Sequence, residues 1–475
     1  MSGYKSFIKN VGLLTIANFG SKILVFLLVP LYTNVLSTSD YGTYDLVFNT
    51  VSILVPLLTQ NIIDGVLRFA LDKDVNKDKV IDIGLKYFAI SIFPVILILL
   101  LNIFFEVLPQ FIPIEPYFFV IYVSQALSGI VLYYVRGLNR FKEIAFSSVL
   151  CSALVILCNI FFLIVFKLGL NGYFLANVIG PFVQIGYLFF ILKGYRPNFI
   201  HVDRVLERQM LIYSRPLIAN TVAWWFNNVF DRYIVTFFCG VAENGIYAVA
   251  SKIPSILSVF QNIIGQAWIV SATDEFDPKD TNGFFTKMYN LYNSFMVLLG
   301  STIIAANLLL AKIMYANEFY VAWKYAPFLT LSIVFGAVSG YVGGIMGAVK
   351  DSAQFAKSTV IGSFVNVILN LILVPYIGAF GSALSTLLCY IVIWALKMKS
   401  LSKYITLHLS LFRDCFSYLI LFVQCVLMLL LYSNYIGLYI SEALCFLSII
   451  FLYNKELNLV LRKIIAISRK ENDVH

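Results

Sequence analysis

The stretch PLIANTVAWWFNNVFDRYIVTFFC, residues 216–239, is apolar except for amides and one adjacent acid and base, Asp231 and Arg232. A helix needs about 20 predominantly apolar residues to cross a bilayer, and this stretch is 24 residues long. Similar stretches recur along the chain, which is 60% hydrophobic and only 12% charged. Because backbone groups in lipid are satisfied only in helices or closed barrels, the sequence predicts an all-α integral membrane protein.

We expect about 14 transmembrane helices, each long enough to cross the hydrocarbon core. Their predicted bounds are 10–36, 42–67, 83–107, 117–137, 144–166, 173–193, 211–239, 246–272, 286–312, 327–349, 358–376, 381–399, 415–433 and 437–454. The first is expected to remain in the mature protein, because Lys22 interrupts its middle and no small-residue cleavage site follows. The connecting loops are short, so no separate soluble domain is expected.

Positive charges are distributed unevenly around these helices. With both termini placed in the cytoplasm, 28 of the 34 Lys and Arg residues lie on or next to the inner side. Three lie on the outer side, namely Lys167, Lys312 and Lys324. The other three lie within helices, namely Lys22, Arg232 and Lys252. This is the positive-inside pattern, so the net charge of +9 requires no nucleic-acid partner.

The chain also repeats itself. The echoed segments, in pairs, are IAN at 16–18 and 218–220, QNII at 60–63 and 261–264, and LGLNG at 168–172 with IGAFG at 377–381. Their order and nearly constant offsets indicate that the first six helices were duplicated. We therefore expect two six-helix lobes, 1–200 and 201–400, related by a parallel repeat of the transporter type, and two further helices and a tail in 401–475.

In such repeats the substrate site lies between the lobes. An ionised side chain near the bilayer centre costs at least about 2.5–3.5 kcal/mol, so it usually faces protein or a wet cavity. With 100° of rotation per residue, polar side chains line one face of the first helix and one face of the seventh. The stripe on the first helix contains Asn18 and Lys22. The stripe on the seventh contains Asn220, Trp224, Asn227 and Asp231. Because IAN makes these helices counterparts, we expect both stripes to face one central cavity.

Adjacent residues on a helix point about 100° apart, so Asp231 and Arg232 are expected to have different partners. We expect an interhelical Asp231–Lys252 pair that leaves Arg232 for the negative charge of a ligand. The alternative is a buried pair that only locks two helices, with Arg232 extending towards the membrane surface. Arg215, at the inner mouth of the seventh helix, fits either an anchor or an entry point for an anion. Three acids near outer helix ends are expected to reach water, namely Asp45, Glu318 and Glu442.

Other residue types exclude several kinds of site. The seven cysteines include no CxxC pair, and neither a metal nor a cofactor is expected. All three histidines lie outside the predicted spans, which argues against a histidine proton relay within the membrane. No HExxH, GxSxG or Walker A motif is present, and no catalytic residue is assigned. The tenth helix offers bend points and close helix contacts at Gly336, Gly340, Gly343, Gly344 and Gly347.

Several stretches carry a family resemblance: FIKNVGLLTIANFGSKILVFLLVPLYTNVLSTSDYGTYDL, RGLNRFKEIAFSS, YSRPLIANTVAWWFNNVFDRYIV with GIYAVASKIP, and LNLILVPYIGAFGSALST. With them the chain resembles the oligosaccharide flippases of bacterial polysaccharide synthesis, the Wzx-like members of the MOP exporter superfamily. The resemblance implies a cationic cavity between two six-helix lobes, in which Lys22, Arg232 and Lys252 would be cavity cations and Asp231 their charge partner.

The resemblance further implies a substrate and a setting. The substrate would be a lipid diphosphate-linked oligosaccharide, commonly on undecaprenyl, moved from the inner to the outer leaflet of the bacterial cytoplasmic membrane for O-antigen or capsule assembly. The partners would be a polysaccharide polymerase and a chain-length protein, with the chain itself a monomer. Lipid II flippases typically have several arginines in the first two helices, whereas this chain has only Lys22 there, which favours a sugar repeat unit.

Two alternatives compete with this interpretation. A cation-coupled multidrug exporter of the MATE type shares the architecture, but such exporters usually need embedded acids, and here embedded bases outnumber the embedded acid. A membrane sugar polymerase or ligase generally holds catalytic groups in a large outer loop, which the short loops here disfavour.

Overall fold

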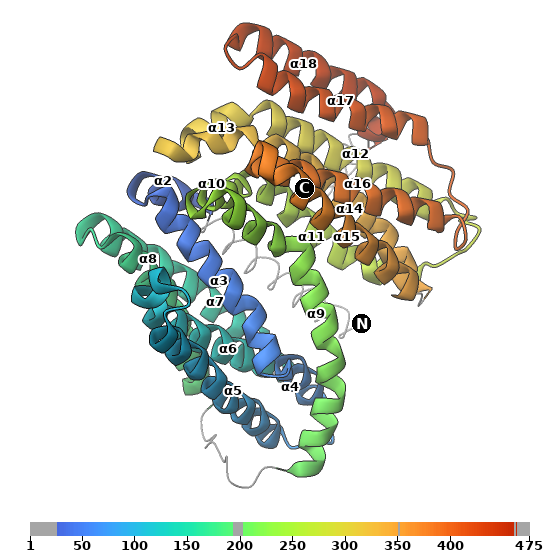
Figure 1. The fold of residues 1–475 in the computed structure, drawn as a ribbon. Helices are drawn as coiled ribbons and strands as arrows, with labels where there is room; N and C mark the ends of the chain where they lie inside the picture. Colours follow the sequence, from blue (N-terminus) through green and yellow to red (C-terminus); the bar gives the residue numbers. More distant parts are fainter. Residues whose placement is uncertain (1–25, 193–202, 350–351, 460–461, 463–475) are drawn as a thin grey trace, which may run out of the picture. The chain divides into compact units, whose positions relative to one another are not determined.

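A computed structural model describes residues 26–192, 203–349, 352–459 and 462 (Figure 1). Within these ranges every regular element is a helix, so the predicted all-α class is confirmed. The chain divides into two compact units, and the division falls between Tyr233 and Ile234. It lies inside the long helix α9 (Arg204–Cys239), so one continuous helix belongs to both units.

The N-terminal unit is centred on α6, which packs against α3, α4, α5 and α8. Its interior is apolar, with fully buried Ile62, Ile81 and Ile130 contributed by α4, α5 and α6. Gly137 allows α4 and α6 to approach closely, because a Cβ there would lie 2.4 Å from that of Ala70. The elements are α2 (Val29–Val35), α3 (Thr38–Leu58), α4 (Ile62–Ala70), α5 (Lys77–Phe105), the 3₁₀-helix η1 (Pro109–Ile114), α6 (Glu115–Gly137), α7 (Phe141–Asn159), the π-helix η2 (Ile160–Val165), α8 (Gly169–Ile191) and most of α9.

Side-chain caps determine where two of these helices begin. Ser37 Oγ accepts the N–H of Asp40 at 3.0 Å, and the Asp40 carboxylate accepts the N–H of Ser37 at 3.2 Å, a capping box that starts α3. Asp203 accepts two N–H groups in the first turn of α9. The Lys79 ammonium, 3.0 Å away, and these N–H groups hold the pKa of Asp203 below its ordinary value. This ion pair also connects the starts of α5 and α9.

The C-terminal unit is centred on α14, most of which is buried. α14 packs against α11, α12, α15, α16 and α17. After the end of α9, the elements are α10 (Val241–Ala250), α11 (Lys252–Asp274), α12 (Phe284–Ala305), α13 (Asn307–Met314), the 3₁₀-helix η3 (Asn317–Lys324), α14 (Ala326–Ala348), α15 (Ser352–Ile377), α16 (Ala379–Leu401), α17 (Leu411–Leu430) and α18 (Tyr435–Leu452).

The helix bounds confirm the internal repeat. The two ends of α6 and α14 are each 211 positions apart, and those of α8 and α16 are each 210 apart. Within each unit these helices also have equivalent neighbours, since α8 packs on α6 and α7 while α16 packs on α14 and α15. α17 and α18 have no counterpart among the described N-terminal helices, as expected for two appended helices.

The multi-pass membrane architecture is supported, but the count of fourteen spans is not confirmed. Among the described residues, ten helices are long and apolar enough to cross a membrane, or twelve if each of two bent pairs is one span. The predicted first span lies largely outside the described residues. The predicted seventh, α9, is not among the ten, because its amides and charges make it too polar.

Four predicted spans differ in shape from expectation. α3 and α4 form a span bent by 63°, since Pro56 weakens the end of α3 and Gln60 and Asn61 have left-handed φ values of 55° and 52°. α12 and α13 are bent by 60° without a proline at the break. The predicted helix 246–272 is interrupted at Ser251, and 144–166 ends as the π-helix η2.

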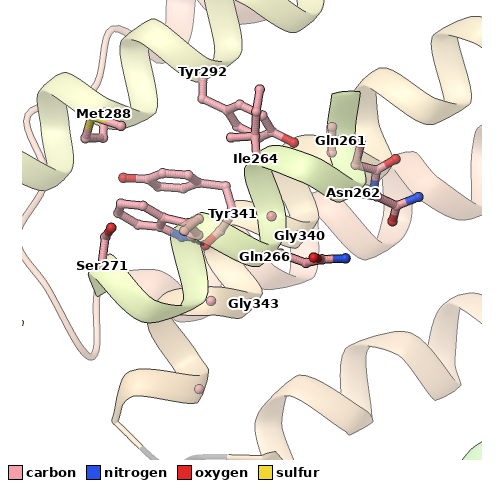
Figure 2. Close-up of a pocket in the computed structure, with 15 residues that line it drawn as sticks. Gln261, Asn262, Ile264, Gln266, Ser271, Met288, Tyr292, Gly340, Tyr341 and Gly343 are labelled. Carbon is pink, nitrogen blue, oxygen red and sulfur yellow. Dashed lines mark hydrogen bonds between the residues drawn. The ribbon is translucent and has the colours of Figure 1, made fainter. Parts of the chain in front are cut away.

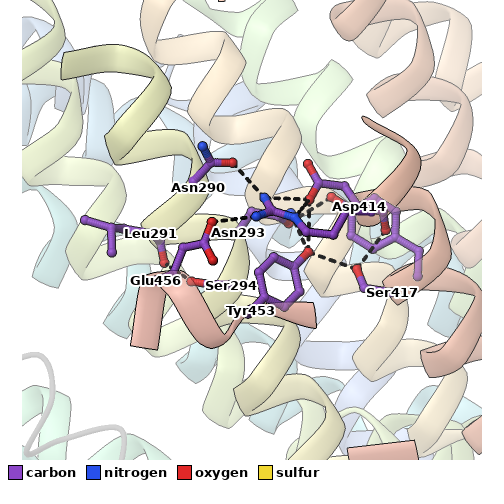
Figure 3. A network of polar contacts seen from close by, with 10 residues as sticks. Asn290, Leu291, Asn293, Ser294, Asp414, Ser417, Tyr453 and Glu456 are labelled. Atoms are coloured by element: carbon purple, nitrogen blue, oxygen red, sulfur yellow. Dashed lines mark hydrogen bonds and ion pairs between the residues drawn. The ribbon is translucent and has the colours of Figure 1, made fainter. Parts of the chain in front are cut away.

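A polar network attaches α17 and the segment after α18 to α12 (Figure 3). The Arg413 guanidinium forms ion pairs with Asp414, at 3.1 Å, and with Glu456, and donates to Asn290 Oδ1 at 2.7 Å. Its Cζ also lies 4.6 Å from the centre of the Tyr453 ring. The Asp414 side chain is fully buried, so the charge of Arg413 is needed to offset it.

Candidate functional site

One face of α9 is held against α3. The Trp225 indole N–H donates to the backbone oxygen of Asn49 at 3.0 Å, and the hydroxyls of Tyr233 and Thr50 share a hydrogen bond of 2.7 Å. Between these contacts, Arg232 Nη1 donates to both carboxylate oxygens of Asp45, at 3.0 and 2.9 Å. This part of α9 is therefore tied to α3 by two neutral hydrogen bonds and one ion pair.

Two expectations are corrected here. Arg232 was expected to be left for a ligand, and Asp45 to reach water, but the two form an ion pair with both side chains only 15% exposed. No local pattern in the sequence indicates this pairing, because Asp45 lies 187 positions earlier in the chain than Arg232. The pairing means that Arg232 meets a ligand only by sharing or exchanging this carboxylate.

The predicted stripe on α9 faces away from this contact. Asn220 and Trp224 are exposed, with Trp224 65% exposed, and Asn227 and Asp231 are partly buried. Asp231 Oδ1 accepts the backbone N–H of Arg232 at 2.9 Å. The matching stripe of the first helix, Asn18 and Lys22, lies outside the described residues.

Lys252 is the first residue of α11 and is partly buried, directly after the break at Ser251. It belongs to the C-terminal unit and Asp231 to the N-terminal unit, so their pairing stays a prediction.

Arg215 lies on the exposed side of α9, where its Nε donates to Gln60 Oε1 at 2.9 Å, at the α3–α4 bend. It borders a groove of about 610 Å³ that is also lined by Arg204 and Arg208. The acid of the groove, Glu207, is held by Lys86 at 2.7 Å, so the arginines give the groove a net positive charge. Of these three arginines only Arg215 was predicted as a site residue, although their spacing along one helix could have indicated the other two.

The C-terminal unit contains a pocket of about 550 Å³ between α11, α12 and α14 (Figure 2). The amides Gln261, Asn262 and Gln266 lie towards one side, and Ser271 and Tyr341 towards the other. Among the residues that the structure describes, no Lys, Arg, Asp or Glu lines the pocket. The amide, hydroxyl and phenol groups of such a pocket can exchange hydrogen bonds with a neutral polyhydroxyl group.

Glycines on one face of α14 make room for this pocket. The Trp268 ring stacks on Tyr341 with centroids 4.1 Å apart, and its indole N–H donates to the backbone oxygen of Tyr341 at 2.8 Å. Gly344 lies directly beneath, where a Cβ would be 2.6 Å from the indole. Close helix contacts at these glycines were predicted from the sequence, but the pocket was not. The repeated QNII segment was a usable signal, because it contains Gln261 and Asn262.

We expect Gly344→Ala to destabilise the protein by about 1–3 kcal/mol, because the indole is fixed on both sides and cannot move away from the added methyl group. Gly340→Ala is the matched control, since its Cβ would lie 4.0 Å from Gln261 in ordinary contact. That variant should be neutral or slightly stabilising, because alanine favours a helix. Thermal unfolding of both variants in one detergent measures the difference, and equal midpoints would contradict the packing described for Trp268.

Comparisons with known proteins agree with this fold. The lipid II flippase MurJ, in an inward closed conformation, matches with a TM-score of 0.67 and 17% identity over 95% of this chain and 99% of that chain. An inward-facing MATE family multidrug resistance transporter of the MOP superfamily matches with a TM-score of 0.62 and 13% identity, over 81% of this chain and 95% of that chain. A mutant of the Vibrio cholerae MATE transporter VcmN matches with a TM-score of 0.54 and 14% identity, over 84% of this chain and 97% of that chain.

At the level of sequence, no curated protein matches the chain. The family model described as polysaccharide biosynthesis protein matches residues 7–269, which is more than half of the chain. The chain therefore belongs to the polysaccharide biosynthesis protein family, and its fold is similar to those of the MurJ flippase and the MATE transporters.

Proposed function

We propose that the chain is a flippase that moves a polyprenyl diphosphate-linked oligosaccharide repeat unit from the inner to the outer leaflet of the bacterial cytoplasmic membrane by alternating access. The observation that carries the proposal is the family match over residues 7–269. The fold shared with a protein named as a lipid II flippase supports it. The distribution of Lys and Arg supports two cytoplasmic termini.

The chemistry of the two units supports a substrate that is charged at one end and neutral at the other. In the N-terminal unit, Arg204, Arg208 and Arg215 line a basic groove, and the planar guanidinium suits phosphate because it can donate two parallel hydrogen bonds. In the C-terminal unit, the amide-lined pocket suits sugar hydroxyls. A lipid tail needs no protein pocket, because it can remain in the bilayer.

Multidrug export is the competing function, since MATE transporters have a similar fold. A cationic drug would favour an acidic site. In the part of the chain that the structure describes, the C-terminal pocket has no acidic lining residue, and Asp45 is neutralised by Arg232. These observations favour the lipid-linked oligosaccharide.

The test uses vesicles that contain the purified protein and a fluorescent polyprenyl diphosphate oligosaccharide in both leaflets. An impermeant reductant added outside should quench the label of both leaflets, because the protein brings lipid from the inner leaflet to the outer one. In protein-free vesicles the reductant should reach only the label of the outer leaflet. The same lipid with one phosphate should flip more slowly, by about tenfold for each 1.4 kcal/mol of lost phosphate contact. Accessible label measured over time gives both rates.

Further substrates make the result decisive. Lipid II in place of the oligosaccharide tests which saccharide is carried, and a cationic dye with an imposed ion gradient tests drug export. Dye movement without any lipid flipping would reject the proposed function in favour of export.

A further inference from the structure

A buried carboxyl group lies within the appended helices. Glu442 is the eighth residue of α18 and is 1% exposed. Its Oε2 accepts a hydrogen bond from Gln424 Nε2 on α17 at 2.7 Å. Gln424 Oε1 in turn accepts the hydroxyl of Ser301 on α12 at 2.8 Å. The three helices are thus joined by a short chain of hydrogen bonds that ends at an acid.

The position of Glu442 corrects the expectation that it reaches water near an outer helix end. Helix α18 begins at Tyr435, so Glu442 lies two turns inside it, and α12 and α17 cover its side chain. The sequence distinguishes poorly between a carboxyl group at a helix end and one two turns further in. Only the packing of α17 and α18 decides that water is excluded.

No cation offsets this acid within the described residues. No Lys, Arg or His forms an ion pair with Glu442 there, and its Oε1 has no hydrogen-bond partner. The titratable groups that face it are two thiols, Cys425 of α17 and Cys445 of α18, and α12 contributes the uncharged hydroxyl of Ser301 behind Gln424.

Asp414, which is also buried in α17, provides the contrast because it has Arg413 beside it. A carboxylate buried without a counter-charge costs several kcal/mol, whereas the neutral acid can keep the hydrogen bond from Gln424. The surroundings of Glu442 therefore accommodate its protonated form.

We propose that Glu442 is a proton-binding site within the membrane, and that loss and regain of this proton accompany the transport cycle. In this arrangement the carboxyl group holds the proton. If α17 and α18 separate enough to admit water, the proton leaves to that water and a carboxylate remains, and closure of the helices requires its return. The claim that the proton is lost and regained during transport rests on the proposed transport function. The claim that Glu442 holds a proton does not.

Infrared spectroscopy of the protein in lipid nanodiscs tests the first part without any transport. At neutral pH, the wild type should show a carboxylic acid C=O band that Glu442→Gln removes. Glu318→Gln is the matched control, because Glu318 of η3 is exposed to solvent and its replacement should leave the band unchanged. Absence of the band from the wild type would overturn the proposal, and this outcome does not depend on whether the variant folds.

Flipping in vesicles with an imposed pH gradient tests the second part. Where proton binding limits the rate, the wild-type rate should change by up to about tenfold per pH unit, and Glu442→Gln should flatten this profile. If both proteins flip with the same pH dependence, Glu442 is not the coupling site. If neither protein flips the lipid but the infrared band is present, the proton site stands and the proposed function fails.

Discussion

Replacing Arg413 by alanine should lower the free energy of unfolding by about 3–5 kcal/mol, the largest change in stability expected in this protein. The substitution leaves the fully buried Asp414 and the mostly buried Glu456 without their shared cation. It also removes the contact with Asn290 of α12 and the packing on Tyr453. Denaturant unfolding in detergent measures the loss, and the abundance of the variant in membranes should fall with it.

Two further variants test the cause of this loss. Lys455→Ala removes an exposed cation next to Glu456 and should change stability by no more than about 0.5 kcal/mol. Arg413→Met with Asp414→Asn removes both members of the buried pair, so it should be milder than the single alanine substitution. If Arg413→Ala were as stable as Lys455→Ala, the network would not hold α17 in place.

Replacing Arg232 by glutamine should slow flipping by about tenfold to a hundredfold if the guanidinium meets the diphosphate during transport, because charge-assisted hydrogen bonds contribute about 1.5–3 kcal/mol each. Asp45→Asn should keep or raise the rate, because it removes the acid that competes with phosphate for Arg232. Initial rates in the vesicle assay, corrected for reconstituted protein, provide the measurement.

The double variant Asp45→Asn with Arg232→Gln separates a binding role from a structural one. If Arg232 binds substrate, the double variant remains as slow as Arg232→Gln. If Arg232 only neutralises Asp45, removing both charges restores the rate, because no buried acid is left unpaired. Restoration would exclude Arg232 from the substrate path and leave the basic groove around Arg215 as the phosphate contact to test next.

The helices and the repeat were predicted from patterns along the chain that do not depend on which helices are in contact. Apolar runs of membrane length predicted the helices, and the IAN and QNII echoes predicted two similar halves, which the offset between α6 and α14 confirmed. The bends were less accessible. Pro56 gave a hint of the α3–α4 bend, but nothing in the sequence between α12 and α13 marks that break as a proline would.

The partners of charged side chains were the least predictable feature. Arg232 and Asp45 are on helices whose contact no local pattern encodes, and the same holds for the chain from Ser301 through Gln424 to Glu442. The α14 glycines were recognised as close-contact positions, but their role in seating Trp268 required the position of α11. Candidate residues can thus be named from sequence, whereas their electrostatic state cannot.

By itself, the sequence determined that this chain is a helical membrane protein made of two related halves, because hydrophobic length and periodicity act within a single helix. Only the tertiary structure decided that Arg232 is paired with Asp45, that Glu442 is shielded from water, and that α14 borders a pocket lined by amides. The physical reason is that burial and charge compensation are properties of surfaces in contact, and those surfaces are set by helices far apart in the chain.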